Sequence, residues 1–226
     1  MNQNRKQFSS ELALLIGLLL NSFCVSLLAK SDFGISTLSS VPLVLSKIVS
    51  QISFGTWNFL IQALTIILLI IITHKPKISY VGSFVLAYLF GNFIDFYSQF
   101  IDLWPNTYFF RIIYFFIGFT FIAIGASLFL KCKLPVLPFD NFVRDICEWS
   151  NLSVQYVKTI FDFICVLITT ILSFWFLGHL TAVGLGTILG MLFTGSMTHS
   201  ICKYLDRKFQ FHGTFEITRR YINWIE

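Results

Sequence analysis

The sequence predicts an all-α, polytopic membrane protein whose six transmembrane helices form a 3+3 inverted repeat. Of its 226 residues, 56% are hydrophobic and only 12% are charged, whereas soluble domains carry about 25% charged residues. Six apolar stretches are long enough to cross a bilayer. Each half of the chain also contains one proline-led amphipathic segment, which defines a unit of three spans that is used twice. Because three is odd, the second unit must lie inverted relative to the first.

The expected spans cover residues 12–28, 54–73, 79–98, 107–129, 155–177 and 182–201. They define a single transmembrane domain, 1–205, with repeats at about 10–100 and about 107–205, followed by a basic and aromatic tail at 206–226. The first stretch could instead be a cleaved signal peptide, because Arg5 and Lys6 precede it. No clear small-x-small cleavage site follows, so we expect this stretch to remain as the first span.

Each half contains one amphipathic segment that opens at a proline. In residues 41–52 the apolar side chains recur at helical spacing, with Pro42 in the first turn and Ser40 as the expected N-cap. Residues 138–149 repeat this pattern behind Pro138, with a charged opposite face. Two interpretations remain open. Each segment is either an interfacial helix at the lipid headgroups or a re-entrant element beside a central cavity.

The distribution of the sixteen basic residues predicts the orientation. If the amino terminus is cytoplasmic, Lys30 and Lys47 lie outside, and Arg111 and Lys158 lie within spans. The other twelve then lie inside: Arg5, Lys6, Lys75, Lys77, Lys131, Lys133, Arg144, Lys203, Arg207, Lys208, Arg219 and Arg220. This excess follows the positive-inside rule, so both termini are expected in the cytoplasm. The net charge of +5 then reflects topology and attraction to anionic lipid, and no nucleic-acid partner is expected.

The two halves can be aligned at offsets that grow by one helical turn. The matched positions are Pro42 with Pro138 at an offset of 96; Ser53, Asn58 and Gln62 with Ser153, Lys158 and Asp162 at 100; and Gly82 and Gly91 with Gly186 and Gly195 at 104. Chance matches between apolar helices are common, so the repeat depends mainly on the order of its elements.

Polar residues within spans are the candidates for a substrate path, because ionisable groups in lipid usually face a bundle interior. Lys158 and Asp162 are four residues apart and share a helix face. Their aligned counterparts, Asn58 and Gln62, share a face of the second span. In an inverted repeat these faces would line opposite ends of one path. The alternative is a structural pair in which Lys158 extends to the cytoplasm.

Asp95 and Arg111 form a second candidate pair. Each is eight residues from Leu103, so an antiparallel hairpin would place them at similar depth. We expect a salt bridge that either locks the hairpin or forms an outer gate. Asn92 and His199 complete the set of path candidates. His199 aligns with Asp95 at an offset of 104, and a lone histidine near the end of a span is more often a hydrogen-bonded interfacial residue than a proton relay.

Several classes of site are not expected. The five cysteines lack metal-ligand or disulfide spacing, so neither a metal nor a cofactor is expected. The sequence contains no HExxH, GxSxG or Walker motif and no recognisable carboxylate pair, which argues against an enzyme. Ala13 and Gly17 are spaced four apart on the first span, so they either pack within the chain or dock a membrane partner.

A family resemblance rests on several stretches. They are LLAKSDFGISTLSSVPLVLS at 27–46, Ser53-Phe54-Gly55, Phe90-Gly91-Asn92-Phe93-Ile94-Asp95, Leu137-Pro138 and Val157-Lys158-Thr159-Ile160-Phe161-Asp162. These stretches resemble the YczE/YyaS/YitT group of bacterial integral membrane proteins across most of residues 10–205. The family carries Pro-Phe-Gly where this chain has Ser153-Val154-Gln155. The resemblance implies a protein of the bacterial cytoplasmic membrane without a settled activity.

The inverted plan favours a small transporter, or permease, for an unidentified small molecule. Such a protein would alternate access between its two halves. The alternative is a substrate-binding or accessory subunit of a larger transport complex, which would dock its partner through Ala13 and Gly17. Membrane lipid and a small-molecule substrate are the expected partners in either case.

Overall fold

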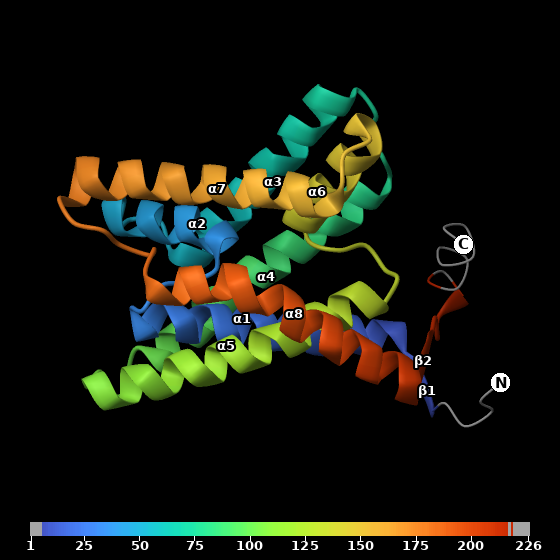
Figure 1. Ribbon diagram of the computed structural model, residues 1–226, viewed down its shortest axis with the longest axis horizontal. Coiled ribbons are helices and arrows are strands. Elements are labelled where there is room, and N and C mark those ends of the chain that lie inside the picture. The colour runs from blue at the N-terminus through green and yellow to red at the C-terminus, as the bar shows by residue number, and fades with distance from the viewer. Residues whose placement is uncertain (1–5, 217, 219–226) are drawn as a thin grey trace.

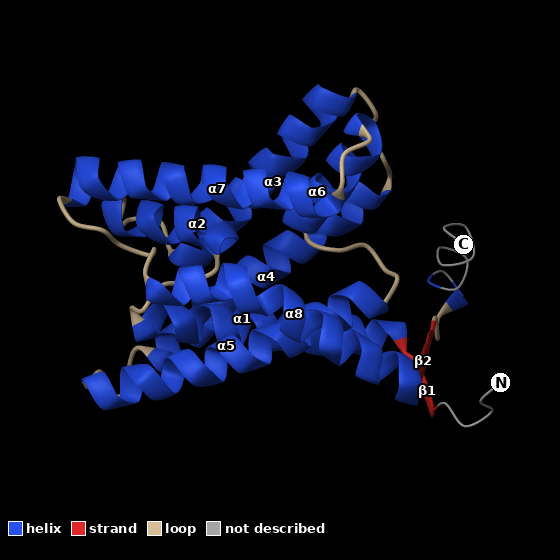
Figure 2. Ribbon diagram, in the orientation of Figure 1, coloured by secondary structure: helices blue, strands red, loops and turns tan. Residues whose placement is uncertain are grey.

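A computed structural model of the chain describes residues 6–216 and 218, and these residues form eight α-helices and one pair of short strands (Figure 2). The helices are α1 (Ser10–Ser31), α2 (Thr37–Ile48), α3 (Phe54–Thr73), α4 (Ser79–Ile101), α5 (Tyr108–Lys131), α6 (Pro138–Ser150), α7 (Val154–Leu172) and α8 (Leu185–Lys208). A π-helical turn, Ser173–Leu177, extends α7, and the strands are β1 (Lys6–Ser9) and β2 (Phe209–His212).

Five of these helices are long and apolar enough to cross a membrane: α1, α3, α4, α5 and α7 with its π-helical extension. They correspond to the first five expected spans. The sixth, expected at 182–201, is the helix α8, which begins at Leu185 and continues to Lys208. It is not among the five, because residues such as Thr194, Ser196 and His199 dilute its apolar character. A sixth helix was therefore predicted in this part of the chain, but it begins and ends later than expected, and its apolarity was overestimated.

The helices form two packed groups joined by α4 (Figure 1). In one group α1 packs along α5, and α5 packs along α8. In the other, α2 and α6 pack against α3 and α7. Helix α4 contacts both α1 and α3 and so connects the groups. One cluster of buried apolar side chains, which includes Val25, Phe54, Phe90 and Phe115, crosses the boundary between the two groups.

The first proline-led helix begins earlier than expected. Helix α2 starts at Thr37, so Pro42 lies inside it rather than in its first turn, and Ser40 is not its cap. A proline at that position removes one backbone donor from the helix. One turn earlier, the Ser40 hydroxyl donates to the Thr37 carbonyl (2.6 Å). Pro138 does open α6, as predicted.

The first part of the expected tail forms the end of α8 and the strand β2. Helix α8 continues to Lys208, and β2 then pairs in parallel with β1, with Phe8 opposite Phe211. Glu11 at the start of α1 accepts hydrogen bonds from the backbone N–H groups of Thr214 and Phe215. The beginning and the end of the described chain are therefore tied together. Of the residues expected at the inner membrane surface, Arg5, Arg219, Arg220, Tyr221 and Trp224 lie outside the described residues.

Candidate functional site

Helices α2 and α6 both begin beside the middle of α7, and they run along α7 in opposite directions. The ring of Phe161 on α7 contacts Phe139 in the first turn of α6, with ring centroids 6.0 Å apart. The next residue, Asp162, accepts a hydrogen bond from the hydroxyl of Thr37, the first residue of α2 (2.6 Å). We call this region, where the first turns of α2 and α6 meet α7, the central junction.

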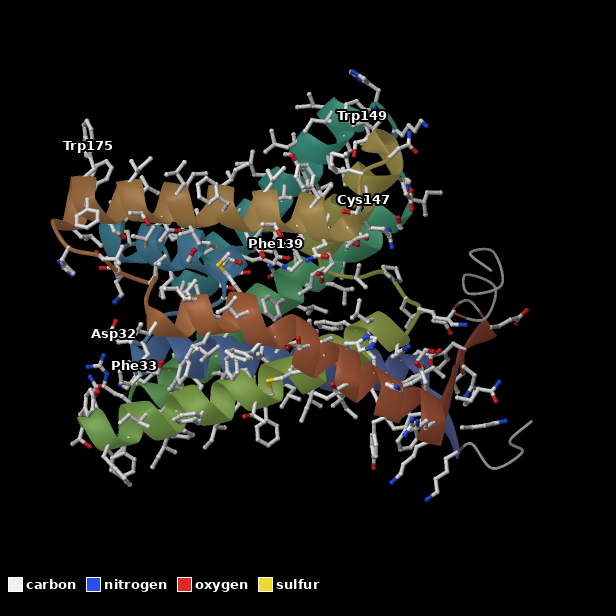
Figure 3. All side chains as sticks on the ribbon, viewed as in Figure 1. Asp32, Phe33, Phe139, Cys147, Trp149 and Trp175 are labelled. Carbon is white, nitrogen blue, oxygen red and sulfur yellow. The ribbon has the colours of Figure 1, made fainter. Side chains whose placement is uncertain are left out.

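From the central junction, α2 and α6 each follow one half of α7. Further along α2, the hydroxyl of Ser40 bonds to that of Thr169 (2.8 Å), which lies towards the carboxyl end of α7. On the other side, Val143 and Cys147 of α6 pack on Val157, near the amino end of α7. The first turns are buried, and Phe139 lies in the middle of the molecule in Figure 3. This arrangement brings the buried first turns of α2 and α6 together at α7, and we call these two shorter helices the half-helices.

The connection between α1 and α2 is held in place by hydrogen bonds to the loop that precedes α8. Ile35 donates its backbone N–H to the Ala182 carbonyl (3.1 Å), and Gly186 donates to the Phe33 carbonyl (2.8 Å). Gly34 has φ +109, a conformation that suits glycine, and a Cβ atom there would lie 2.8 Å from the backbone nitrogen of Gly184. The two loops therefore fix the point at which α2 starts.

Lys158 and Asp162 form the expected ion pair, with Nζ and Oδ2 3.3 Å apart. The two ends of the pair are in different surroundings, because the Asp162 side chain is 10% exposed and that of Lys158 is 52% exposed. Lys158 thus reaches outward while Asp162 stays at the central junction. A carboxylate at the first residue of α2 also suits the positive end of that helix.

Asn58 and Gln62 are fully buried on α3. The Gln62 amide donates from Nε2 to Oδ1 of Asn58 (2.6 Å), but Nδ2 of Asn58 and Oε1 of Gln62 have no hydrogen-bond partner among the described residues. The predicted shared face is therefore present, and it carries spare hydrogen-bonding capacity. Buried polar atoms without partners lower stability.

The predicted salt bridge between Asp95 and Arg111 was wrong. Asp95 instead accepts hydrogen bonds from Ser53 Oγ (2.5 Å) and from the backbone N–H of Gly55 (2.7 Å), and so caps the start of α3. Arg111 pairs with Asp32 (2.8 Å) and also donates to the carbonyl of Ser31 (2.8 Å). Equal distance from a loop predicts similar depth, but it does not predict towards which neighbour each side chain rotates.

Helices α3 and α4 approach closely beside the Asp95 cap. A Cβ atom at Gly55 would overlap the carbonyl oxygen of Gly91, and one at Gly91 would lie 2.5 Å from the carbonyl oxygen of Gly55. Glycine is therefore required on both helices. The aligned position of Gly91 in the second half, Gly195 on α8, has no atom within 4 Å of such a Cβ.

The remaining predicted residues lie away from the central junction. Asn92 is exposed on α4 and donates to the carbonyl of Tyr88 in the same helix (2.7 Å). His199 is exposed on α8. Ala13 and Gly17 are buried, and a Cβ atom at Gly17 would lie 3.1 Å from the ring of Phe129 on α5. In this arrangement the two small residues pack within the chain, and their surface is not free for a partner.

Sequence reasoning missed a polar cluster between α6 and the start of α4. Asp145, which is 3% exposed, accepts a hydrogen bond from the Tyr80 hydroxyl (2.6 Å) and pairs with Lys77 (3.1 Å) and Arg144 (3.0 Å). Burial would raise the pKa of the Asp145 carboxyl, but the hydrogen bonds from Tyr80, Arg144 and Lys77 outweigh this effect and hold the pKa below its usual range. We call these four residues the Asp145 cluster.

The missed residues had a weak signal in the sequence. Asn141, buried on α6, donates to Ser83 (2.5 Å) one turn before Asp145. Asn141 and Asp145 are spaced four apart, as are many buried helix residues, but they lie among exposed charges on one polar face. Thr37, Ser40 and Thr169 are uncharged and resemble ordinary helix residues. Only their contacts across α2 and α7 distinguish them.

The described residues offer no evident metal site. Within 6–216 and 218, no group of three or more His, Cys, Asp or Glu side chains could hold a metal ion. All five cysteines are buried and free. The central junction supplies the hydroxyl group of Thr37 and the carboxylate of Asp162, which suit the binding of a polar solute.

The fold defines a multi-pass, α-helical membrane protein with a buried polar junction between two half-helices. Residues 8–203 match a protein family described as a family of unknown function, DUF6198, and the chain belongs to this family. It is also similar to the uncharacterized protein YyaS of Bacillus subtilis (strain 168), with 26% identity over 196 residues that cover 86% of this chain and 92% of that protein. No solved structure matches the chain.

These relationships confirm the resemblance to YyaS-like proteins, and the structure explains several of the stretches that carry it. Ser53-Phe54-Gly55 and Asp95 meet at the cap of α3. The stretch 157–162 brings Phe161 and Asp162 to the central junction. The stretches that carry the resemblance thus include residues from both helices of the α3–α4 contact. They also include the residues of α7 at the central junction.

Proposed function

We propose that the chain is a small secondary transporter that moves a small molecule across the bacterial cytoplasmic membrane by alternating access. The observation that supports this proposal is the exchange of half-helices between the two parts of the chain. Helix α2 packs on α7, and α6 packs on α3. Re-entrant segments that meet near the middle of a helix bundle are common at the substrate sites of transporters built from inverted repeats.

The inverted repeat itself is part of this proposal. It assigns α1 to α4 to one repeat and α5 to α8 to the other, with α8 as the sixth span. The packing of α1 on α4 then corresponds to that of α5 on α8, and the packing of α2 on α7 corresponds to that of α6 on α3. The excess of basic residues on one side favours cytoplasmic termini.

A difference in helix packing between the two halves supports the proposal that α7 and α8 move relative to each other. Helices α3 and α4 pack closely at Gly55 and Gly91, whereas α7 and α8 pack against each other far less. In Figure 3, Trp175 projects outward from the far end of α7, and its side chain is 81% exposed. We propose that α7 and α8 close together in the opposite state, which would change access to the central junction.

The function can be tested with purified protein. A thermal-shift screen against metabolites should identify a ligand, because a ligand at 100 times its dissociation constant stabilises the folded state by about 2.7 kcal/mol. Liposomes that contain the protein should then take up this ligand without ATP or partner proteins. Binding without uptake, together with a membrane partner that copurifies in stoichiometric amounts, would favour the binding-subunit alternative and contradict independent transport.

The role of the Lys158–Asp162 pair is tested in the same assay. We expect Asp162→Asn to reduce uptake at least about tenfold while the melting temperature changes little, because the amide can still accept the Thr37 hydrogen bond. The double variant Lys158→Met with Asp162→Leu should retain the fold, since no unpaired charge remains, but should not transport. Full uptake by this double variant would exclude the pair from the site.

A further inference from the structure

The amide pair Asn58–Gln62 has a fixed hydrogen-bonding capacity that no neighbour uses. Both side chains are 0% exposed, and a single hydrogen bond of 2.6 Å joins them. A half-turn of an amide group exchanges its oxygen and nitrogen with almost no change in shape. If both amides are turned over, Asn58 donates to Gln62, and one N–H₂ group and one carbonyl oxygen are again left. In either orientation, the pair offers one spare donor group and one spare acceptor.

The pair lies between the two half-helices. On the same helix, Phe54 belongs to a buried cluster with Leu43 of α2, and Leu69 belongs to a buried cluster with Phe142 of α6. Asn58 and Gln62 lie between these contact zones, at the part of α3 where α2 gives way to α6. On α7 the same change from α6 to α2 occurs between Phe161 and Asp162.

The carboxylate of Asp162 at the central junction is already paired. Asp162 is bonded to Lys158 (3.3 Å) and to Thr37 (2.6 Å), and the repeat positions on α3 carry neutral amides instead. A substrate ion at the amide pair would therefore gain no opposite charge from α3. A neutral group with one donor and one acceptor would satisfy both spare atoms.

A purely structural role does not explain the pair. Two buried amides with spare atoms lower stability, and apolar side chains of similar shape would pack there without that penalty. Stability alone therefore favours leucine and methionine at these positions. The polar pair is instead useful if a ligand completes its hydrogen bonds in another state of the protein.

We infer that Asn58 and Gln62 form a substrate subsite that binds an uncharged polar group presenting both a donor and an acceptor, such as a carboxamide or a hydroxyl group. This inference rests on the proposed transport function. It identifies the substrate as a small neutral polar molecule, and it assigns to the pair the recognition of that molecule by two hydrogen bonds.

The first test separates recognition from stability. In the double variant Asn58→Leu with Gln62→Met, we expect the melting temperature without ligand to rise by roughly 3 °C, because the unpartnered amide atoms are removed. A control is Thr120→Val, which removes a hydroxyl group that is exposed on α5 and already bonded within its helix. A clear fall in the melting temperature of the double variant would show that the pair is structural and would overturn the inference.

The second test measures uptake into proteoliposomes of three neutral probes, urea, glycerol and malonamide, and two charged probes, acetate and methylammonium. We expect at least one neutral probe to enter the proteoliposomes faster than it enters protein-free liposomes. The double variant should reduce this rate to the protein-free level, and Thr120→Val should retain it. Equal rates in the wild type and the double variant would overturn the inference.

The two proposals fail in different ways. Protein-dependent uptake of a charged probe, with no uptake of a neutral probe, would overturn the substrate class and leave transport standing. If no probe enters, the inference about neutral solutes is wrong, and the proposed function is then decided by uptake of the ligand from the metabolite screen.

Discussion

Replacing Asp145 with asparagine is expected to destabilise the protein by about 2–3 kcal/mol, or roughly 5–10 °C in melting temperature. The variant keeps the shape of the side chain but leaves Lys77 and Arg144 without their buried partner. The full penalty for breaking a buried ion pair is larger, but these two cations are 38% and 47% exposed and remain partly hydrated. Thermal unfolding in detergent measures the change.

Glu148→Gln is the matched control, because it removes the other carboxylate that pairs with Lys77. The Glu148 side chain is 61% exposed, so the change should stay within about 0.5 kcal/mol.

The low pKa of Asp145 also predicts a pH dependence of the protein's stability. The ionised Asp145 carboxyl contributes fully to the stability of the folded state above the pKa of the unfolded state, near 3.9. This contribution is lost as the pH falls through the lower pKa of the folded state. An acid sensitivity that persists unchanged in Asp145→Asn would contradict this account of the cluster.

Gly91→Ala is expected to destabilise the protein by about 3 kcal/mol, because the new Cβ atom would lie 2.5 Å from the carbonyl oxygen of Gly55. Helices α3 and α4 would have to separate, and this would also disturb the hydrogen bonds that Asp95 accepts from Ser53 and Gly55 at the start of α3. The melting temperature in detergent should fall accordingly.

Gly195→Ala provides the control, because it makes the same change at the aligned position of the second half. Its Cβ atom meets no atom within 4 Å, and alanine favours helix, so the variant should be neutral or slightly more stable. If both variants destabilise equally, then α8 must be packed at Gly195, and the proposed difference between the halves is wrong.

Much of the helical framework could be predicted from the sequence, since apolar length and proline position are local signals. The ends of α3 and the start of α6 agree with their predictions. The start of α2 does not, because its first turn is stabilised by tertiary contacts, such as that between Thr37 and Asp162, and not by a local cap. The strand β2 pairs with a partner about 200 residues away, which no local pattern indicates.

The candidate site was predicted in part. The burial of Asn58, Gln62 and Asp162 follows from the cost of placing polar groups in lipid. The Lys158–Asp162 pair follows from helical spacing. The partners of Asp95 and Arg111 could not be found in this way, because rotation about each helix axis depends on the packing of several helices together.

The inverted repeat is tested most directly by finding on which side of the membrane the turns after the two half-helices lie. Gln51 and Leu152 are exposed on these turns and lie at almost equivalent positions of the proposed repeats. All five native cysteines are buried, so single cysteines at these sites can be labelled selectively. With an impermeant maleimide, Gln51→Cys should react in intact cells, and Leu152→Cys should react only after permeabilisation. Labelling of both from the same side would contradict the inverted repeat and the alternating-access mechanism that depends on it.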